Sequence, residues 1–549
     1  MTSTTSENLE TLAQALESGV RSWSQHPLLQ VLPETARIYG IAQGQLSYGH
    51  VQREAERLRE AYSRAGYGHG HRVGLLLENR PSFIVHWMAL NALGVSVVPI
   101  NGEMRAAELE YLIDHSEMVL AVALPSHHGV LHAAARTVNS PLQVIQDDQP
   151  PPHAVCPAPL AGQRVNIDTE CGLLYTSGTT GRPKGCILSN RYFLMAGQWY
   201  AALKGVVNLQ PGQEKMLTPL PLVHMNAMAF SYTAMLLTGG CLILVDRFHP
   251  STWWDSVRES RATVIHYLGV MPAMLMKAPA SEQDRAHTVR FGFGAGVNRS
   301  LHQPFEERFG FPLVEAWAMT ETGAGGVVIA HEEPRLPGTS CFGREDDSLE
   351  VRLVADDGQD AGVDQPGEML VRRAGPEPRL GFFSGYLKDE AATREAWMDG
   401  WFHTGDIVQR DAQGQLHFID RRKNVIRRSG ENIAAVEVES VLLQHPLIGA
   451  AAVAAVPDPV RGDEVMACVI APEVAGTAAA REAAAHDIVQ WCLSRLAYYK
   501  APGYVAFVQA LPLTTSQKVQ RADLRQLAVS LPGQEVCIDT RHLKKRQSA

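Results

Sequence analysis

The chain has 549 residues, a length that predicts roughly two to four domains or subdomains rather than one hydrophobic core. Its apolar content of 45% and charged content of 19% exclude an intrinsically disordered chain. The net charge of -9 argues against nucleic acid or an anionic membrane surface as the main partner, but it is compatible with a local nucleotide pocket.

In chain order, the first elements alternate between helix and strand. Residues 50–65 have the pattern of an amphipathic helix that ends at Gly66, and residues 71–79 form an apolar strand. A helix over 80–94 and a strand over 95–101 follow. Because this alternation continues over much of the first 420 residues, it predicts an α/β fold of parallel sheets covered by helices. Such sheets bind ligands at the carboxyl ends of their strands.

Eight cysteines are scattered along the sequence, and no two of them stand in a C-x-x-C spacing. The pattern favours reduced thiols in the cytoplasm over a zinc site or a redox pair. The first ten residues have neither the basic nor the apolar region of a signal peptide. The apolar stretches are too short or too interrupted to cross a bilayer, so we expect no stable membrane insertion.

The strongest local signal is the segment Tyr175–Gly185, which lies between two short apolar runs. Gly178 and Gly181 allow backbone N–H groups to turn inward, and Lys184 adds a positive charge. The hydroxyl donors are Thr176, Ser177, Thr179 and Thr180. The spacing differs from a Walker A loop. An ordinary flexible turn is the alternative, but it explains this ordered string poorly, so we predict a phosphate-binding loop.

Six further motifs follow the phosphate loop or close the chain. They are Pro219–His224, Gly294–Gly296, Trp317–Gly323, Gly400–Asp406, Asp420–Asn432 and Leu511–Val519. Each has an ordinary structural explanation when taken alone, such as a core histidine for His224 or an exposed lysine for Lys518. Together with the phosphate loop, and in this order, the motifs resemble those of the adenylate-forming superfamily over residues 35–530. That superfamily includes acyl- and aryl-CoA synthetases, adenylation domains of peptide synthetases and firefly-type luciferases.

The resemblance implies two domains. Residues 1–422 would form a large α/β domain of helix-covered sheets that binds ATP. Residues 423–549 would form a smaller, mobile α+β domain that carries the catalytic lysine, Lys518. Lys423 would be the hinge between them.

The resemblance also assigns residues to the nucleotide. Phosphate would contact the loop Thr176–Gly181 and Thr320, with Lys184 as a catalytic cation. Glu321 would be catalytic as well, and would hold Mg²⁺ together with Thr176, because this cation prefers oxygen ligands. The adenine would lie against Gly294, Ala295, Gly296 and a stacking Trp317, and the ribose against Asp406 and Arg421.

The remaining roles concern the acid and coenzyme A. His224 and Gly323 would lie at the acid pocket, and Gly430 would lie at the channel for coenzyme A. The sequence around Gly430 is most like crotonobetaine/carnitine-CoA ligases. Gln517 replaces the glycine that usually precedes the catalytic lysine, which restricts positive φ in that loop.

The expected reaction follows from the chemistry of a carboxylate, which is a poor acyl donor until it is joined to AMP. Mg²⁺ and Lys518 would offset the repulsion between the acid and ATP, so no protein nucleophile is needed. We expect an ATP-dependent ligase that passes the acyl group to coenzyme A. The alternatives are an adenylation enzyme that loads a carrier protein, a luciferase-like monooxygenase and a degenerate binding protein. The sequence leaves the acid and the assembly open, a homodimer included.

Overall fold

The computed structural model describes residues 9–176, 183–297, 299–355, 357–421, 425–472, 474, 477–512, 519 and 521–544. Several predicted site residues lie outside this part of the chain: Ser177, Gly178, Thr179, Thr180, Gly181, Lys423 and Lys518. The side chain of Arg421 also lies outside it. Among the described residues, no helix is both long and apolar enough to cross a membrane.

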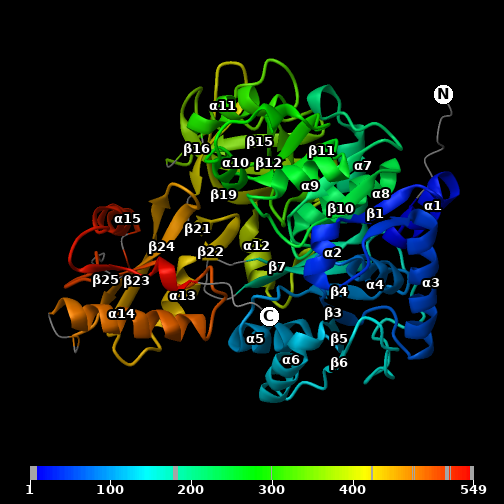
Figure 1. Cartoon of the computed structure of the whole chain (residues 1–549), viewed down its shortest axis with the longest axis horizontal. Coiled ribbons are helices and arrows are strands. Elements are labelled where there is room, and N and C mark those ends of the chain that lie inside the picture. The colour runs from blue at the N-terminus through cyan, green and yellow to red at the C-terminus, as the bar shows by residue number, and fades with distance from the viewer. Residues whose placement is uncertain are drawn as a thin grey trace.

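Two large sheets form the bulk of the molecule (Figure 1). The first has eight strands in the order β14 (Val328–Ile329), β13 (Leu313–Trp317), β12 (Phe291–Ala295), β11 (Val264–Leu268), β9 (Lys215–Thr218), β10 (Cys241–Leu244), β1 (Pro27–Val31) and β2 (Gly44–Ser47). The second has seven: β17 (Gly385–Tyr386), β8 (Lys184–Ser189), β7 (Glu170–Thr176), β4 (Ser96–Pro99), β3 (Arg72–Leu76), β5 (Leu120–Ala123) and β6 (Gln143–Ile145). In the first sheet the inner strands pair in parallel and an antiparallel strand stands at each edge. In the second sheet β7, β4, β3, β5 and β6 pair in parallel, while β8 and β17 are added antiparallel at one side.

Helices cover these sheets, as the alternating pattern predicts. They are α1 (Leu12–Trp23), α2 (Pro33–Tyr39), α3 (Tyr48–Arg64), α4 (Pro81–Asn91), α5 (Ala106–Ser116), α6 (Pro125–Thr137), α7 (Asn190–Ala202), α8 (Thr233–Thr238), α9 (Trp253–Ser260), α10 (Val270–Leu275) and α11 (Arg299–Phe309). The expected helices and strands between residues 50 and 101 are confirmed as α3, β3, α4 and β4. Ser47 caps α3 by accepting a hydrogen bond from the backbone N–H of His50, and Gly66 follows the helix with φ of 89°.

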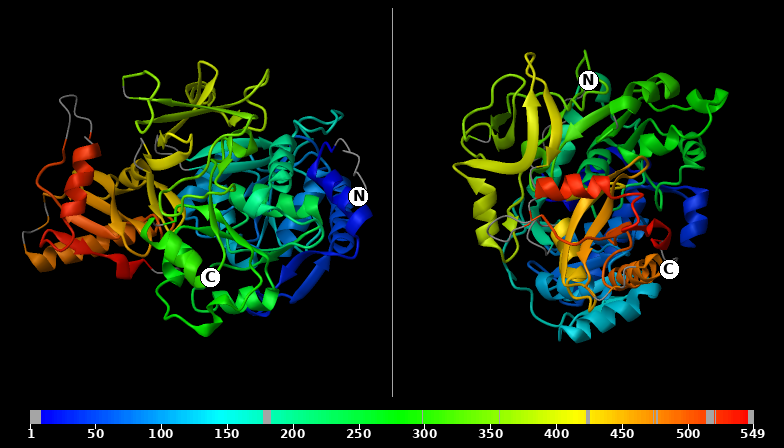
Figure 2. Two further views of the ribbon diagram at one scale, coloured as in Figure 1. Left: turned by 90° about the horizontal axis from the view of Figure 1, so that it is seen from above. Right: turned by 90° about the vertical axis from the view of Figure 1, so that its left-hand side faces the viewer.

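A third, five-stranded sheet follows in the chain and is antiparallel throughout. It contains β15 (Leu349–Val354), β16 (Pro366–Arg373), β18 (Trp397–Met398), β19 (Trp401–Arg410) and β20 (Leu416–Arg421), and α12 (Glu390–Ala396) lies beside it. In the left view of Figure 2 its strands stand above the rest of the molecule in green and yellow. The alternating sequence pattern did not predict this sheet, which departs from the parallel architecture expected before residue 420.

The described residues between 425 and 544 form a separate α+β body with two hydrophobic clusters of its own. Its sheet contains β22 (Glu431–Ala434), β21 (Val425–Arg428), β23 (Ala450–Asp458), β24 (Gly462–Ile470), β25 (Tyr504–Phe507) and β26 (Cys537–Asp539). The helices α13 (Ala435–Leu442), α14 (Ala478–Leu493) and α15 (Arg521–Ser530) pack against it. This body lies beside the N-terminal domain in Figure 1, in orange and red. The large N-terminal and smaller C-terminal domains are thus confirmed, while the boundary at 422/423 falls on residues that are not described.

Candidate functional site

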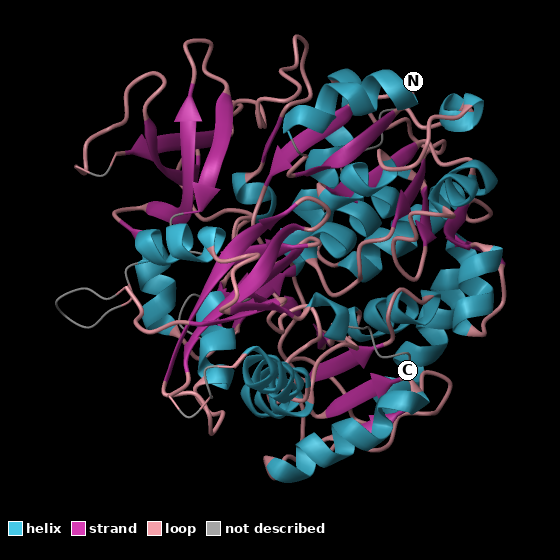
Figure 3. Ribbon diagram, turned by 60° about the vertical axis from the view of Figure 1, so that its left-hand side comes forward, coloured by secondary structure: helices cyan, strands magenta, loops and turns pink. Residues whose placement is uncertain are grey.

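A cavity of about 750 Å³ lies where the three N-terminal sheets meet the C-terminal domain. Its walls include Thr176 at the end of β7, Ala295 at the end of β12, Gly405 on β19 and Gly430 in the turn between β21 and β22. Figure 3 shows the C-terminal domain in front of the N-terminal sheets. The carboxyl ends of parallel strands and a second domain therefore share one cavity, as the α/β pattern predicts.

At one end of the cavity, three side chains meet around the carboxylate of Glu321. Thr176 Oγ1 donates to Glu321 Oε1 at 3.3 Å, and Tyr386 Oη donates to the same atom at 3.0 Å. Lys184 pairs with Thr176 across the β7–β8 hairpin, and its Nζ lies 4.8 Å from the centre of the Tyr386 ring. The structure thus brings together Thr176, Lys184 and Glu321, which the sequence placed 145 residues apart at most.

Tyr386 is a member of this group that the sequence analysis missed. Burial, reinforced by the charge of Glu321, raises the pKa of its hydroxyl well above the ordinary value, so the group stays a proton donor. It lies on β17, which pairs with β8 directly beside the phosphate-loop hairpin. Its place in an edge strand 65 residues after Glu321 gives no local pattern by which the sequence could reveal it.

A second group joins Trp317 and Asp406. The indole Nε1 of Trp317 donates to Asp406 Oδ2 at 2.8 Å, and both side chains are buried. Thr404 Oγ1 accepts from the backbone N–H of Asp406 at 3.0 Å and donates to the carbonyl oxygen of Met369 at 2.6 Å. Thr404 and Gly405 line the cavity. Trp317 orients Asp406 from a buried position next to the cavity-lining Ala316 and Ala318, and its stacking on adenine stays a prediction.

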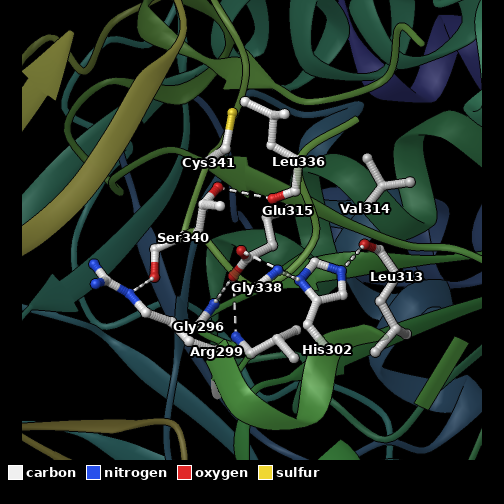
Figure 4. A network of polar contacts seen from close by, with 12 residues as sticks. Gly296, Arg299, His302, Leu313, Val314, Glu315, Leu336, Gly338, Ser340 and Cys341 are labelled. Atoms are coloured by element: carbon white, nitrogen blue, oxygen red, sulfur yellow. Dashed lines mark hydrogen bonds and ion pairs between the residues drawn. The ribbon is translucent and has the colours of Figure 1, made fainter. Parts of the chain in front are cut away.

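The adenine motif Gly294–Gly296 is held by Glu315, another residue that sequence analysis missed (Figure 4). Its Oε1 accepts hydrogen bonds from the backbone N–H groups of Gly296 at 2.9 Å and Val297 at 3.0 Å. Burial raises the pKa of Glu315. Its Oε2 is buried and has no hydrogen-bond partner among the described residues. Glu315 thus shapes the carboxyl end of β12 through a contact between neighbouring strands.

Two neighbouring side chains complete the network in Figure 4. His302 Nε2–H donates to the carbonyl oxygen of Leu313 at 2.8 Å, while its Nδ1 accepts from the backbone N–H of Gly338 at 3.2 Å. Arg299 Nε donates to Ser340 Oγ at 2.9 Å. These contacts join α11 to the segment that leads into the third sheet, so they support the wall from behind.

The two residues predicted for the acid pocket have different surroundings. His224 lines the cavity, its side chain is 45% exposed, and its Nε2 lies 3.7 Å from Glu431 Oε2 of the C-terminal domain. Loss of hydration disfavours the charged His224 ring, but the neighbouring carboxylate of Glu431 outweighs this effect. The pKa of His224 is therefore raised. Gly323 does not line the described cavity. It has φ of 49°, and a Cβ there would lie 2.3 Å from the ring of Tyr192, so its part in acid binding stays a prediction.

Gly430 lies in the tight turn between β21 and β22, and both turn residues have positive φ. Ser429 has φ of 51° and Gly430 has φ of 87°, which favours glycine in this hairpin. The turn also packs against the N-terminal domain, because a Cβ on Gly430 would lie 2.1 Å from Leu268 Cδ1. The predicted coenzyme A residue is therefore a close contact between the two domains at the cavity.

Lys500 makes a second, buried contact between the domains that was not predicted. Its Nζ lies 2.7 Å from Glu108 Oε1 on α5 and 2.7 Å from Glu437 Oε1 on α13. Burial opposes the lysine charge, but the two carboxylates outweigh it and raise the pKa of Lys500. Lys500 and Glu108 are 392 positions apart in the sequence, so no local sequence pattern could predict their contact.

The predicted catalytic Lys518 lies outside the described residues, but Leu511 and Val519 of the same motif are described. Leu511 and Val519 pack against the cluster that includes Leu524 of α15. Neither residue lines the described cavity, whereas Gly430 and Lys500 do. In this arrangement the C-terminal domain therefore presents the β21–β22 turn to the cavity.

Comparison with protein families gives matches to both domains. The model of the AMP-binding enzymes matches residues 30–387, and the model of their C-terminal domain matches residues 437–518. The sulfoacetate–CoA ligase of Cupriavidus necator is 32% identical over 534 residues, which cover 94% of this chain and 98% of that relative. The crotonobetaine/carnitine–CoA ligase of Salmonella typhimurium is 27% identical, with coverage of 90% and 96%.

Solved structures give the same architecture. The o-succinylbenzoate CoA synthetase of Bacillus subtilis has a TM-score of 0.78 at 23% identity, with coverage of 93% of this chain and 98% of that chain. The amide bond synthetase McbA of Marinactinospora thermotolerans also has a TM-score of 0.78 at 23% identity, with coverage of 94% and 99%. These two likenesses establish the fold alone. With both domains matched by family models, the chain belongs to the AMP-binding enzyme family.

Proposed function

We propose that this protein is an ATP-dependent acid–CoA ligase that forms an acyl-AMP and then a thioester. The observation that carries the proposal is one cavity lined by Thr176, Lys184 and Glu321, by Thr404 and Gly405 of β19, and by the Gly430 turn. The names of the two curated relatives, both CoA ligases, support the same reaction.

In the first step, a carboxylate oxygen of the acid attacks the α-phosphorus of ATP, and pyrophosphate leaves. Lys184 and Lys518 offset the repulsion between the two anions and stabilise the charge that develops on the phosphates. Asp406, oriented by Trp317, accepts hydrogen bonds from the ribose. The turn at Gly294–Gly296, held by Glu315, accommodates the adenine.

Glu321 and Thr176 fit a magnesium site. A carboxylate oxygen and a hydroxyl oxygen lie 3.3 Å apart, and Mg²⁺ commonly binds one or two such protein ligands together with phosphate oxygens and water. When bound, Mg²⁺ would neutralise phosphate charge. Tyr386 keeps the Glu321 carboxylate oriented toward this position by donating to Oε1.

In the second step, the sulfur of coenzyme A attacks the acyl carbon, AMP leaves, and the thiol proton passes to solvent. We propose that this step uses the arrangement in which the Gly430 turn packs against Leu268 and Lys500 pairs with Glu108. Adenylation requires a different placement that brings Lys518 to the cavity. We propose that Lys423, which lies outside the described residues, is the hinge for this change.

The acceptor separates the proposal from its alternatives. An enzyme that loads a carrier protein, and a luciferase-like monooxygenase, would share the first step, and the fold also occurs in an amide bond synthetase. The eight cysteines are free thiols, which fits a reducing compartment such as the cytoplasm.

A two-part assay tests the proposed function. With Mg²⁺ and a broad panel of acids but no coenzyme A, we expect acid-dependent exchange of pyrophosphate into ATP. Adding coenzyme A should then give a thioester and AMP in equal amounts. If none of the acids supports exchange, ligase activity is contradicted. If an acid supports exchange but no thioester forms with coenzyme A, coenzyme A is contradicted as the acceptor.

A further inference from the structure

The part of the cavity wall that follows His224 contains a short π-helix, Asn226–Tyr232. Asn226 and Phe230 both line the cavity, as does Phe293 of β12. The rings of Phe230 and Phe293 have centroids 6.0 Å apart. Asn226 therefore places an amide beside apolar and aromatic walls, and π-helical turns often occur at functional sites.

A buried hydrogen-bond network fixes the orientation of this amide. His266 Nδ1 lies 2.8 Å from Asn226 Oδ1 and 2.8 Å from Ser231 Oγ, and His266 Nε2 lies 3.3 Å from the hydroxyl of Tyr200. The His266 ring also stacks on Phe293, with centroids 4.8 Å apart. The ring is therefore held on one face by Phe293 and at both nitrogens by buried hydrogen-bond partners.

One assignment of protons satisfies every member of the network. The Tyr200 hydroxyl donates to Nε2, so the His266 proton lies on Nδ1 and is donated to Asn226 Oδ1. Ser231 Oγ donates to the backbone carbonyl oxygen of Asn226 at 3.2 Å. The amide oxygen of Asn226 therefore faces His266. Its Nδ2 makes no hydrogen bond to the described residues, and Asn226 lines the cavity, so Nδ2 is the amide atom left to serve a ligand there.

The network provides hydrogen-bond donors without a positive charge. Burial lowers the pKa of His266 to about 3, so the ring remains neutral. The neighbouring cavity residues Met225, Phe230 and Phe293 are apolar. An anionic group placed here would lose hydration and gain no opposite charge from His266, whereas a neutral acceptor would gain a hydrogen bond.

We infer that Asn226 is a specificity-determining residue, and that the acid carries an uncharged hydrogen-bond acceptor, such as a carbonyl or ether oxygen, which accepts from Asn226 Nδ2. His266, Ser231 and Tyr200 are positioning residues for this amide. The inference rests on the proposed function and identifies the class of acid that the site selects.

The test compares matched acids in pyrophosphate exchange. The panel contains straight-chain acids of roughly four to eight carbons, their oxo analogues with the carbonyl at each internal position, and the dicarboxylates of equal length. The wild type should favour at least one oxo acid over its alkyl and dicarboxylate partners by about tenfold or more in kcat/KM, because a site built to donate a hydrogen bond rejects analogues without the acceptor.

Two substitutions at Asn226 make the test specific. Asn226→Leu keeps the approximate size of the side chain and should remove the preference, so that oxo and alkyl acids of equal length are exchanged with similar kcat/KM. Asn226→Asp keeps the shape and replaces the donor with an acceptor, so it should lose the same preference even where the leucine variant folds poorly. His266→Phe retains the ring stacking and should reduce the preference without a contact to the acid.

The results separate this inference from the proposed function. Exchange with alkyl acids as fast as with every oxo acid, or equal losses for all acids in both Asn226 variants, would overturn the inference alone. A preference for the dicarboxylates would contradict the inference that the acceptor on the acid is uncharged. If no acid in the panel supports exchange, the proposed function and this inference are overturned together.

Discussion

The nucleotide end of the cavity and the interface between the domains differ in what holds their side chains. Glu321, Tyr386, Trp317 and Asp406 all belong to the N-terminal domain, and hydrogen bonds of 2.8–3.0 Å within it fix them. Gly430 and Lys500 instead contact the N-terminal domain from the C-terminal one. On the proposed domain movement, the first region would keep its geometry in any placement of the second domain, whereas the contacts of the second region would form in only one placement. Substitutions in the two regions should therefore affect different half-reactions.

The largest effect should come from Glu321→Gln, at the preorganised end. The amide keeps the shape but removes the charge that would hold Mg²⁺, so adenylation should fall by about 100-fold or more. Pyrophosphate exchange, titrated with Mg²⁺, measures the loss. Tyr386→Phe is the matched control, because it removes one donor to Glu321 and keeps the carboxylate, so its loss should be smaller. If Glu321→Gln exchanges pyrophosphate at the wild-type rate, the proposed role of Glu321 in adenylation is contradicted.

Gly430→Ala should affect the interface and spare the nucleotide end. A Cβ would collide with Leu268 in the present placement of the domains, so thioester formation from supplied acyl-AMP should fall by about tenfold or more. Pyrophosphate exchange without coenzyme A should remain within about threefold of the wild type. Gly414→Ala is the control, because Gly414 has a similar φ of 82° and no atom within 4 Å of its Cβ. An equal loss of thioester formation in Gly430→Ala and Gly414→Ala would show that backbone strain in the turn, and not the contact with Leu268, causes the effect.

Lys500→Met should have an intermediate effect on the same step. Removing the cation leaves Glu108 and Glu437 buried without their partner, which destabilises the docked placement. We expect thioester formation to fall by roughly three- to tenfold, with exchange unaffected. The triple variant Lys500→Met/Glu108→Gln/Glu437→Gln should recover part of the rate because it no longer buries unpaired carboxylates. A triple variant slower than the single one would contradict the ion-pair explanation.

The smallest effect should be a pH dependence of docking through His224. Its pKa is raised when Glu431 is near, so the pair stabilises the docked domain fully below the ordinary histidine pKa and is lost as pH rises through the raised value. The ring is 45% exposed, so we expect a decrease of only about two- to threefold in thioester formation. The Glu431→Gln variant should not show this decrease. If the wild type and Glu431→Gln show the same pH dependence of thioester formation, the His224–Glu431 pair does not contribute to docking.

The sequence predicted what depends on local pattern. The helices and strands between residues 48 and 99 follow from periodicity and capping, and the phosphate-loop neighbours Thr176 and Lys184 follow from one short motif. The third sheet did not follow, since its antiparallel strands interrupt the alternation. Tyr386, Glu315 and Lys500 were missed because their roles come from contacts between separate strands or domains. Such contacts leave no periodic trace in a single sequence.

The central claim, that one cavity serves two half-reactions through two placements of the C-terminal domain, is tested most directly by Lys518→Ala and Lys423→Pro. Single-turnover rates of acyl-AMP formation and of thioester formation from supplied acyl-AMP are measured for each variant. Lys518→Ala should lose the first step and retain the second. Lys423→Pro, with φ locked near ~-65°, should retain the first and lose the second. Equal loss of both steps in both variants, or loss of the same step in both, would contradict the claim.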